Sequence, residues 1–327
     1  MRAAIYDRVG AAREVLRVAD VPTPTPGPDE VRVKLEWSGV NPSDVKTRAG
    51  SRSRILPFPQ IIPHSDGAGV IDAVGDNVAR NRIGERVWTW NAAWGRASGT
   101  AAEYVVLPTR QAASLPDNVS GEAGACLGIP ALTAWHAVNV DGGVQGKTVL
   151  IAGGAGAVAH YAIQIARHRG AKKILSTVSS AEKASLAKAA GADCVVNYKT
   201  EDVVARIQAE TEGQGVDRVI EVDFGANVAL DQQAVKRDGD IVVYGSTALE
   251  IAVPFVPCIL KNIRLRFFIV YNLNDADRAQ AIDGVTSLLR ANQLTHNIAE
   301  RLPLDRIAEA HELVEQGRAI GNVVVKI

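Results

Sequence analysis

The chain has 327 residues, of which 47% are hydrophobic and 22% are charged, so it is long enough for two domains with sizeable cores. Its 36 basic residues balance 36 acidic ones, which argues against nucleic acid or an anionic membrane as the main partner, because both require a clustered positive field. No apolar run reaches the roughly 18–20 residues of a membrane span, and the N-terminal stretch lacks the long apolar core of a secretory signal. The three scattered cysteines, Cys126, Cys194 and Cys258, favour reduced thiols in a cytoplasmic protein over a disulfide framework or a metal cluster.

Residues 1–118 read as short strands separated by turns. The predicted strands are Ala3–Tyr6, Leu16–Ala19, Val31–Trp37, Gly67–Val74, Glu85–Trp90 and Ala101–Leu107. Four prolines between Val21 and Asp29 make that stretch an extended loop. The pattern predicts a β-rich domain, most simply a partly open barrel.

Beyond Pro116 the pattern changes, because helices begin to alternate with buried strands. The predicted strands are Thr148–Ala152, Lys173–Val178, Ala192–Val196, Asp217–Val222, Asp240–Tyr244 and Arg264–Val270. The predicted helices are Ser120–Cys126, Ala131–Val140, Ala157–His168, Ala181–Ala190, Glu201–Thr211 and Asn227–Lys236. This alternation predicts an α/β fold with a doubly wound parallel sheet.

The C-terminal tail has no domain of its own. Two amphipathic helices, Ala276–Ala291 and Leu304–Gln316, precede a final strand at Gly321–Ile327. We therefore expect the tail to pack on the N-terminal domain.

A glycine-rich turn follows the first strand of the α/β region. The turn, Gly153–Gly156, leads directly into the helix Ala157–His168 and has the pattern Gly153-x-x-Gly156-x-x-Ala159. Glycines let the backbone turn tightly and bring its N–H groups, with the helix N-terminus, against a pyrophosphate. A lone glycine turn is weak evidence, since Gly-Gly also closes ordinary loops.

The end of the second strand indicates which dinucleotide would bind. An NAD site usually places Asp or Glu here for the ribose 2′-hydroxyl, whereas this chain has Ser179 and Ser180 with Lys183 one helical turn on. A 2′-phosphate requires donors and a cation, so the pattern favours NADP. The alternative is that Ser180 only caps the helix and Lys183 is solvated. Tyr198, after the third strand, would lie near the same pocket or serve as a packed loop tyrosine.

Several modest motifs occur in order along the chain at a familiar spacing. They are Val40–Lys46, the PHSDGAGVIDAVG run at Pro63–Gly75, Gly84–Val87, Ala102–Val105, Leu132–Ala134, the Gly153–Ala159 turn, Lys183 and Tyr198, and Gly321–Val324. Together they resemble the medium-chain dehydrogenase/reductase superfamily, in its zinc-independent quinone oxidoreductase (zeta-crystallin-like) branch. The resemblance covers essentially the whole chain.

The resemblance implies a domain organisation and a set of cofactor-binding residues. It implies a GroES-like catalytic domain at 1–122 and 272–327, with a Rossmann dinucleotide-binding domain at 123–271 inserted into it. The loop residues that match the pyrophosphate site are Gly153, Ala155, Gly156, Ala157 and Val158. The residues that match the 2′-phosphate site of NADPH are Ser179, Lys183 and Tyr198. Those that match the nicotinamide side are Asn41, Thr133, Gly245, Ser246, Phe268 and Val270.

The zinc ligands of other members of the superfamily have no counterparts here. Zinc-dependent members place a cysteine in the loop corresponding to 39–44 and a histidine one residue before the position of Asp66. This chain has Asn41 in that loop and Ser65 before Asp66, and His64 is the only nearby imidazole. One histidine cannot hold a catalytic zinc, so we expect no metal and interpret His64 as a hydrogen-bonded turn histidine.

The expected activity is hydride transfer from NADPH to quinones or α,β-unsaturated carbonyl compounds, which need alignment and an oxyanion donor more than a Lewis acid. Two alternatives stay open, an enoyl-thioester reductase and a non-catalytic NADPH-binding protein of the zeta-crystallin type. No residue is assigned as the catalytic acid. Trp88, Trp90 and Trp94 would either stack on a flat acceptor or fill the core.

The strand Arg264–Val270 (RLRFFIV) is an aromatic and aliphatic stretch at the expected edge of the parallel sheet. Exposed edges of this kind invite pairing, so we expect a homodimer formed by sheet extension. Alternatively, the helix Ala276–Ala291 covers the strand and the protein is monomeric.

Overall fold

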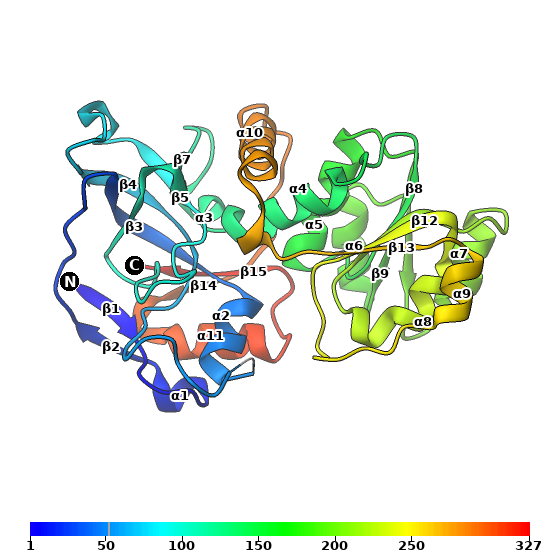
Figure 1. The fold of residues 1–327 in the computed structure, drawn as a ribbon, viewed down its shortest axis with the longest axis horizontal. Coiled ribbons are helices and arrows are strands. Elements are labelled where there is room, and N and C mark those ends of the chain that lie inside the picture. Colours follow the sequence, from blue (N-terminus) through cyan, green and yellow to red (C-terminus); the bar gives the residue numbers. More distant parts are fainter. Residues whose placement is uncertain (52) are drawn as a thin grey trace. The chain divides into compact units, whose positions relative to one another are not determined.

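A computed structural model describes residues 1–51 and 53–327 and divides into two compact units (Figure 1). Unit 1 comprises Met1–Pro130 and Ile282–Ile327, and unit 2 comprises Ala131–Ala281. Both boundaries lie later in the chain than residues 122 and 271, where the sequence places them. The second boundary falls inside helix α10 (Asp275–Arg290), which is why no loop marks it in the sequence.

Unit 1 is built on a seven-stranded sheet with the order β14-β15-β3-β4-β5-β7, in which β6 also pairs with β3. The strands are β3 (Glu30–Val40), β4 (Asp66–Val74), β5 (Arg86–Thr89), β6 (Tyr104–Pro108), β7 (Ala112–Ser114), β14 (Ile298–Pro303) and β15 (Asn322–Lys326). A separate two-stranded sheet pairs β1 (Arg2–Ile5) with β2 (Arg17–Asp20). Because β15 runs antiparallel to β3, the C-terminal tail completes the N-terminal sheet, as predicted. No strand is predicted at β14, because most of its side chains are at least partly exposed and its buried and exposed residues do not alternate.

The helices of unit 1 are short. They are α1 (Ala12–Val15), α2 (Pro42–Ala49), α3 (Gly121–Gly124) and α11 (Ile307–Glu315), with 3₁₀ turns at Arg80–Arg82, Thr109–Gln111 and Leu304–Arg306 and a π-helical turn at Leu127–Ala131. The predicted helix Ser120–Cys126 is wrong in extent, because α3 ends at Gly124 and the π-helical turn with Pro130 follows. Helix α2 occupies a segment expected to be a loop. Proline at its first position is pre-organised for a helix, and Gly50, with φ of 75°, ends it.

Unit 2 contains a six-stranded parallel sheet with the order β10-β9-β8-β11-β12-β13. The strands are β8 (Thr148–Ile151), β9 (Lys173–Val178), β10 (Cys194–Asn197), β11 (Val216–Glu221), β12 (Val235–Val243) and β13 (Arg264–Phe267). This order confirms the predicted doubly wound sheet, and its direction of winding reverses between β8 and β11.

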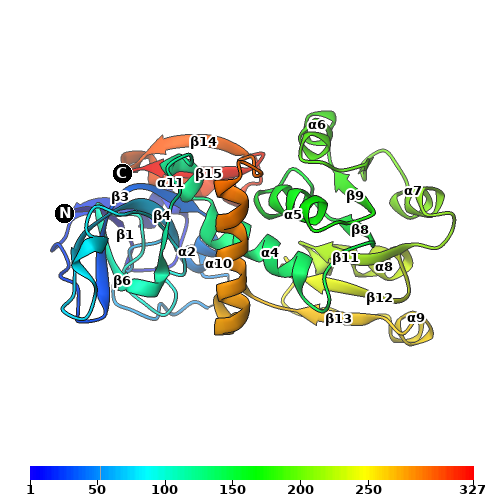
Figure 2. The ribbon, with the colours of Figure 1, turned by 90° about the horizontal axis from the view of Figure 1, so that it is seen from above.

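Helices cover both faces of this sheet. They are α4 (Leu132–Asn139), α5 (Ala157–His168), α6 (Ala181–Ala189), α7 (Val203–Glu210), α8 (Phe224–Ala234) and α9 (Phe255–Leu260), and α10 follows a 3₁₀ turn at Val270–Asn272. Figure 2 shows α4 and α5 on one side of the strands and α7, α8 and α9 on the other. In the part of the chain that the structure describes, no helix is both long and apolar enough to cross a membrane.

Three predicted elements of unit 2 differ from the structure by three or more residues at one end. The strand predicted at Asp240–Tyr244 is β12, which already begins at Val235. The helix predicted at Asn227–Lys236 runs from Phe224 to Ala234, because Val235 already adopts extended backbone and pairs with Val216 of β11. The strand predicted at Arg264–Val270 ends at Phe267, where its pairing with Val243 of β12 ends. The residues after it leave the sheet and form the 3₁₀ turn.

Candidate functional site

The glycine turn after β8 is held against the next strand of the sheet. Gly153, with φ of 71°, donates its N–H to Oγ1 of Thr177 at 3.1 Å, and Gly154 donates to the carbonyl oxygen of Thr177 at 3.0 Å. A Cβ atom at Gly154 would lie 2.2 Å from Oγ of Ser176, so only glycine allows this close approach. The turn is therefore fixed by contacts with β9 and not by its own sequence alone.

Helix α5 starts immediately after this turn. Gly156 is its N-cap residue and has extended backbone, and Ala157 and Val158 lie in the first turn. The N–H groups of a first helical turn have no carbonyl partner within the helix, and the helix dipole favours an anion there. Ala155 and Ala159 are buried beneath this start, where a methyl group fits. The geometry suits a pyrophosphate at the helix N-terminus.

Two of the three residues predicted for the 2′-phosphate lie together at the carboxyl end of β9. Nζ of Lys183 donates to Oγ of Ser179 at 2.9 Å. Ser180 caps α6 by accepting the N–H of Lys183, so the capping role and the lysine contact occur together. Tyr198 is brought alongside by its backbone, since its N–H donates to the carbonyl oxygen of Val178 at 3.0 Å. Its side chain is 54% exposed, which suits both predicted roles, a residue near the pocket and a loop tyrosine half-buried for packing.

The carboxyl ends of β11 and β12 contribute the next group of predicted residues. The carbonyl oxygen of Gly245 accepts the N–H of Phe224 at 3.2 Å, and a Cβ atom at Gly245 would lie 2.3 Å from the carbonyl oxygen of Val222. Ser246 donates its hydroxyl to the carbonyl oxygen of Ala248 at 2.9 Å. Because β8 and β11 lie at the reversal of winding, the ends of these parallel strands share one edge, where doubly wound folds bind ligands.

The remaining predicted residues of unit 2 lie on α4 and in the segment that follows β13, and one of them contacts a buried histidine. Thr133 lies on α4 and is buried, as is His136 one turn later. The rings of His136 and Phe268 are 4.6 Å apart, and burial lowers the pKa of His136. Val270 is buried, and its carbonyl oxygen accepts a hydrogen bond from Arg278 at 2.5 Å.

In unit 1, Asn41 lies beside two buried carboxyl groups. Its backbone N–H donates to Oδ2 of Asp44 at 2.8 Å, and its side-chain nitrogen donates to Oδ2 of Asp66 at 2.9 Å. Burial raises the pKa of Asp44 to about 7, against hydrogen bonds from Asn41 that lower it. Burial likewise raises the pKa of Asp66 well above its usual range.

Both ring nitrogens of the nearby His64 take part in a buried chain of hydrogen bonds. The Thr100 hydroxyl donates to the carbonyl oxygen of Asp66 at 2.5 Å, so Thr100 must accept from Ser38, which lies 2.7 Å away. Ser38 in turn accepts from Nδ1 of His64 at 2.8 Å, and Nε2 of His64 accepts from Nε2 of His311 at 2.9 Å. His64 has φ of 77° and lies between the β-bridge at Ile62 and strand β4, so the structure confirms the predicted hydrogen bonding of the ring, whereas the residue itself is not in a turn. Burial lowers its pKa to about 3.

These residues do not fit a zinc ion. A catalytic zinc needs three protein ligands, but Asn41 and Ser65 stand where the cysteine and histidine would be, and both ring nitrogens of His64 are engaged. Within residues 1–51 and 53–327, no group of three or more His, Cys, Asp and Glu side chains is arranged to hold a metal ion.

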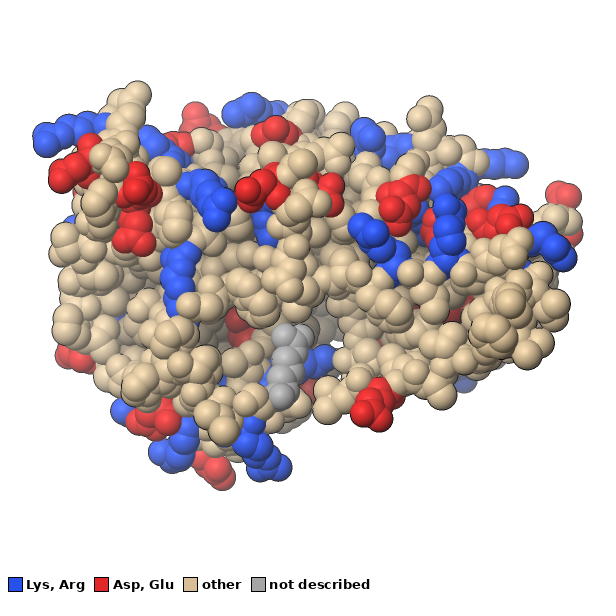
Figure 3. Space-filling model, viewed as in Figure 1, with Lys and Arg blue, Asp and Glu red and all other residues tan. Residues whose placement is uncertain are grey.

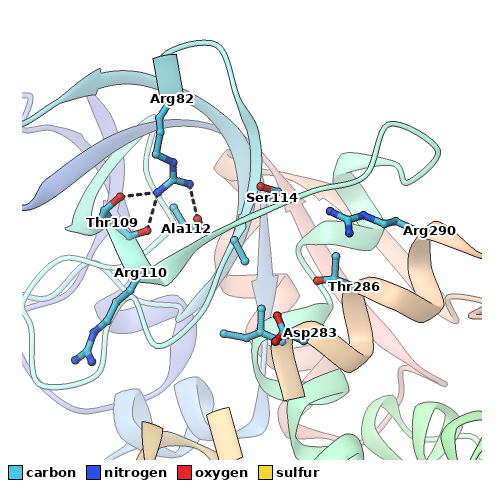
Figure 4. A pocket seen from close by; sticks show the side chains of 10 residues that line it. Arg82, Thr109, Arg110, Ala112, Ser114, Asp283, Thr286 and Arg290 are labelled. Carbon is cyan, nitrogen blue, oxygen red and sulfur yellow. Dashed lines mark hydrogen bonds between the residues drawn. The ribbon is translucent and has the colours of Figure 1, made fainter. Parts of the chain in front are cut away.

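A separate pocket of about 530 Å³ opens in unit 1 between the β7 region and the second half of α10 (Figure 4). None of the predicted cofactor residues line it. Its most central cation, Arg82, is already hydrogen-bonded to Glu85, to Thr109 and to the carbonyl oxygen of Ala112. That guanidinium is structural, and the pocket is not part of the candidate site.

Among the described residues five carboxyl groups are buried, and none of them was predicted as a site residue: Asp44, Asp66, Glu221, Asp231 and Asp240. Glu221 ends β11, and its Oε1 accepts from the N–H of Asp223 and from Nδ2 of Asn227 at 3.0 Å. Burial and the neighbouring Glu221 raise the pKa of Asp231 to about 9. The sequence gives only a weak indication that Asp66 and Glu221 are buried, because Asp66 begins a mostly apolar strand and Glu221 ends one. It offers none for Asp231 in a helix.

Trp88 is in the core, as one of the two readings predicted, whereas Trp94 is exposed.

Comparison with known proteins gives matches in both units. Residues 27–117 match the family model described as the alcohol dehydrogenase GroES-like domain, and residues 157–287 match the one described as zinc-binding dehydrogenase. The quinone oxidoreductase of Homo sapiens is 31% identical over 317 residues, which is 95% of this chain and 94% of that protein.

Solved structures share the fold over the whole chain. An NAD-dependent alcohol dehydrogenase has 32% identity and a TM-score of 0.91, with both chains fully covered. A mycobacterial protein complexed with NADPH has 28% identity and a TM-score of 0.85, again with both chains fully covered. The paired units, the glycine turn and these relatives identify an oxidoreductase that uses a nicotinamide dinucleotide. The chain belongs to the quinone oxidoreductase branch of the medium-chain dehydrogenase/reductase superfamily.

Proposed function

We propose that this protein is an NADPH-dependent reductase that transfers hydride to quinones or α,β-unsaturated carbonyl compounds without zinc. The observation that carries the cofactor assignment is the contact between Lys183 and Ser179 at the end of β9. A cation and a hydroxyl can hold a 2′-phosphate, whereas the ribose 2′-hydroxyl of NAD is usually held by a carboxylate at this place. The quinone oxidoreductase relatives support the class of acceptor.

The donor set around Asn41 supports zinc independence. Alcohol oxidation in this superfamily relies on a Lewis acid, for which three ligands are required. Asn41 and Asp66 are instead hydrogen-bonded to each other, and His64 is tied to Ser38 and His311. An acceptor that is already electrophilic needs only alignment and a donor for the developing oxyanion.

The chain's own residues would bind and orient the cofactor and exclude water. Bound NADPH would supply the hydride. The α5 N-terminus and the Gly153–Val158 turn would hold the pyrophosphate, with Ser179, Lys183 and Tyr198 at the 2′-phosphate. In unit 2, the buried Thr133 would hold the nicotinamide end and Phe268 would add an apolar wall, and in unit 1 the resemblance assigns Asn41 to the nicotinamide side.

The test is NADPH oxidation by the purified protein with quinones, enones and enoyl thioesters. We expect faster turnover with quinones or free enones than with acyl-CoA substrates. Turnover should also be faster with NADPH than with NADH, and a strong chelator should leave it unchanged. Activity only on enoyl thioesters would favour the enoyl-thioester reductase. NADPH binding without oxidation by any acceptor would favour the non-catalytic alternative, and loss of activity on chelation would contradict zinc independence.

We also propose a homodimer that pairs the exposed edge of the parallel sheet. Strand β13 is the last strand of that sheet, and Phe267 on it is 58% exposed. Helix α9 adds exposed apolar side chains, with Phe255 70% and Leu260 66% exposed. Figure 3 shows a largely uncharged surface over the α9 region, as over much of the middle of this face. An apolar edge of this kind favours association of two copies about a two-fold axis.

Light scattering at micromolar concentration tests the dimer. We expect twice the 34.7 kDa mass of one chain for the wild type and a shift toward one chain for Phe267→Asp. Ile83→Asp is the matched control, because Ile83 is also exposed but lies in unit 1. A wild type with the mass of one chain would rule the dimer out.

A further inference from the structure

Asp66 holds two groups of unit 1 through one oxygen atom. Its Oδ2 accepts from Nδ2 of Asn41 at 2.9 Å and from the backbone N–H of Ile129 at 2.9 Å. Asp66 is fully buried at the start of β4, and Ile129 belongs to the π-helical turn that precedes α4. Deviations of this kind from regular α-helix often lie at functional sites.

The Asn41 amide has a fixed orientation, because Asp66 is an acceptor for its nitrogen. The nitrogen and oxygen ends of an amide side chain can be exchanged only if the hydrogen-bonding partners suit both a donor and an acceptor. The Asn41 side chain also lowers the pKa of Asp44 against the effect of burial, so a second carboxyl group favours the same arrangement. The nitrogen end of Asn41 therefore faces the two acids.

The charges near Asp66 do not favour its ionised form. In the part of the chain that the structure describes, no ion pair involves Asp66, and the charge of another carboxyl group, Asp44, raises its pKa further. Its Oδ1 is buried without a hydrogen-bond partner among these residues. An ionised carboxylate in such a place would be very costly, whereas a carboxylic acid carrying its proton on Oδ1 leaves Oδ2 free to accept both N–H groups.

The surroundings of Asp66 allow little movement. Its carbonyl oxygen accepts from Thr100, at one end of the buried chain that continues through Ser38 to His64. A Cβ atom at Gly128 would lie 2.3 Å from Oδ1 of Asp66, so the π-helical turn packs directly on the carboxyl group. Both the backbone and the side chain of Asp66 are thus held in place.

We propose that Asp66 is an uncharged carboxylic acid that serves as a positioning residue: it fixes the Asn41 amide for the nicotinamide end of the cofactor and ties it to the π-helical turn through the Ile129 backbone. This inference rests on the proposed function in assigning Asn41 to the nicotinamide side. Asp66 itself acts through Asn41.

The first test compares cofactor affinities of Asp66→Ala and Asp66→Asn. We expect Asp66→Ala to weaken NADPH binding roughly tenfold, because Asn41 loses an orienting hydrogen bond, and Asp66→Asn to recover most of that loss, since an amide oxygen accepts the same two N–H groups. Adenosine 2′,5′-bisphosphate, which lacks nicotinamide, should bind every variant as it binds wild type. An Asp66→Asn variant as impaired as Asp66→Ala would overturn the uncharged state.

A double-mutant cycle tests whether Asp66 acts through Asn41. Asn41→Ala should weaken NADPH binding by a similar factor, and the double variant should be little worse than either single one. Additive losses would overturn the positioning role. If Asp66→Ala does not fold, Asp66→Leu takes its place in the cycle with Asn41→Ala.

Infrared difference spectroscopy reports whether the Asp66 carboxyl group is charged, and it does not require the protein to be an active enzyme. The spectrum of wild type minus Asp66→Asn should contain the C=O band of a protonated carboxyl group at neutral pH. The control is Asp72→Asn, which removes the partly buried ion-pair partner of Arg32 and should remove only a carboxylate band. A carboxylate band lost in Asp66→Asn would contradict the inference. A wild type that binds NADPH but reduces no acceptor would defeat the proposed function alone, because both binding tests and this spectrum would still report on Asp66.

Discussion

Nζ of Lys183 lies 2.9 Å from Oγ of Ser179, so a cation and a hydroxyl meet at the carboxyl end of β9. The same lysine gives its backbone N–H to Ser180, which caps α6 and fixes the start of the helix. The position of the Lys183 side chain is therefore set by a cap and a hydrogen bond together. Both contacts can be retained while a 2′-phosphate binds, because the ammonium group has three donors.

Replacing Lys183 by alanine should separate the two cofactors. A charge-assisted contact is worth roughly 1.5–3 kcal/mol, so NADPH binding should weaken by about ten- to a hundredfold, while NADH binding stays nearly unchanged. The measurement is Kd for both cofactors at fixed salt, because the contact is partly screened. Lys188→Ala, an exposed lysine on the same helix, is the control. Equal weakening of both cofactors would show that this pocket is wrongly assigned.

Replacing Ser179 by aspartate should shift the preference toward NADH. The new carboxylate would repel the 2′-phosphate and offer the ribose hydroxyls an acceptor, and it would also pair with Lys183. We expect the ratio of the Kd values for NADPH and NADH to rise at least tenfold. Ser185→Asp, on the exposed side of α6, should leave the ratio unchanged. A variant that binds both cofactors as wild type does would contradict the assignment.

The parallel sheet of unit 2 could be predicted from sequence because its central strands are buried on both faces. Leu150 of β8 and Ile174 of β9 lie in continuous apolar runs and are almost fully buried, and α5 begins and ends where its apolar spacing predicts. The edge strand β14 carries no such run. Its pairing with β15 depends on residues near the end of the chain, so no local pattern could reveal it.

The candidate site could be predicted only in part, for the same physical reason. Motif residues such as Gly153 and Lys183 act through the local backbone, so their spacing carries information. Asp66 gains its role from Asn41 and Ile129, which are far away in sequence and are brought to it by the fold. Burial of its carboxyl is a tertiary property, and a single sequence does not display it.

Asp44 should make the stability of the folded protein depend on pH. Its pKa is raised from 3.8 to about 7 by burial, so the folded state keeps a proton that the unfolded state has already lost. The free energy of unfolding should therefore fall as the pH rises from about 4 to about 7, by about 4 kcal/mol at most for this group. Asp44→Asn cannot lose a proton, and its Tm relative to wild type should rise across this range. A Tm difference that does not change with pH would contradict the raised pKa.

The last prediction concerns Arg218, whose side chain is fully buried in unit 2. Its Nε and one terminal nitrogen donate to the two carboxylate oxygens of Asp240 at 2.6 and 2.9 Å, and its other terminal nitrogen reaches the carbonyl oxygens of Ala137 and Val138 at the end of α4. Arg264 lies 3.4 Å from Asp240 but is mostly exposed, so it can compensate only in part.

Removing Arg218 leaves a buried carboxylate and two carbonyl groups without a donor, so Arg218→Met should destabilise the protein by about 3–5 kcal/mol. Adding Asp240→Leu should recover part of this loss, because the unpaired charge is then gone. Calorimetry of the wild type, both single variants and the double variant gives the coupling between the two residues. Arg306→Ala, which breaks an exposed pair with Glu309, should produce no measurable change. If the Arg218 and Asp240 losses simply add, the buried pair does not act as a unit, and the prediction is contradicted.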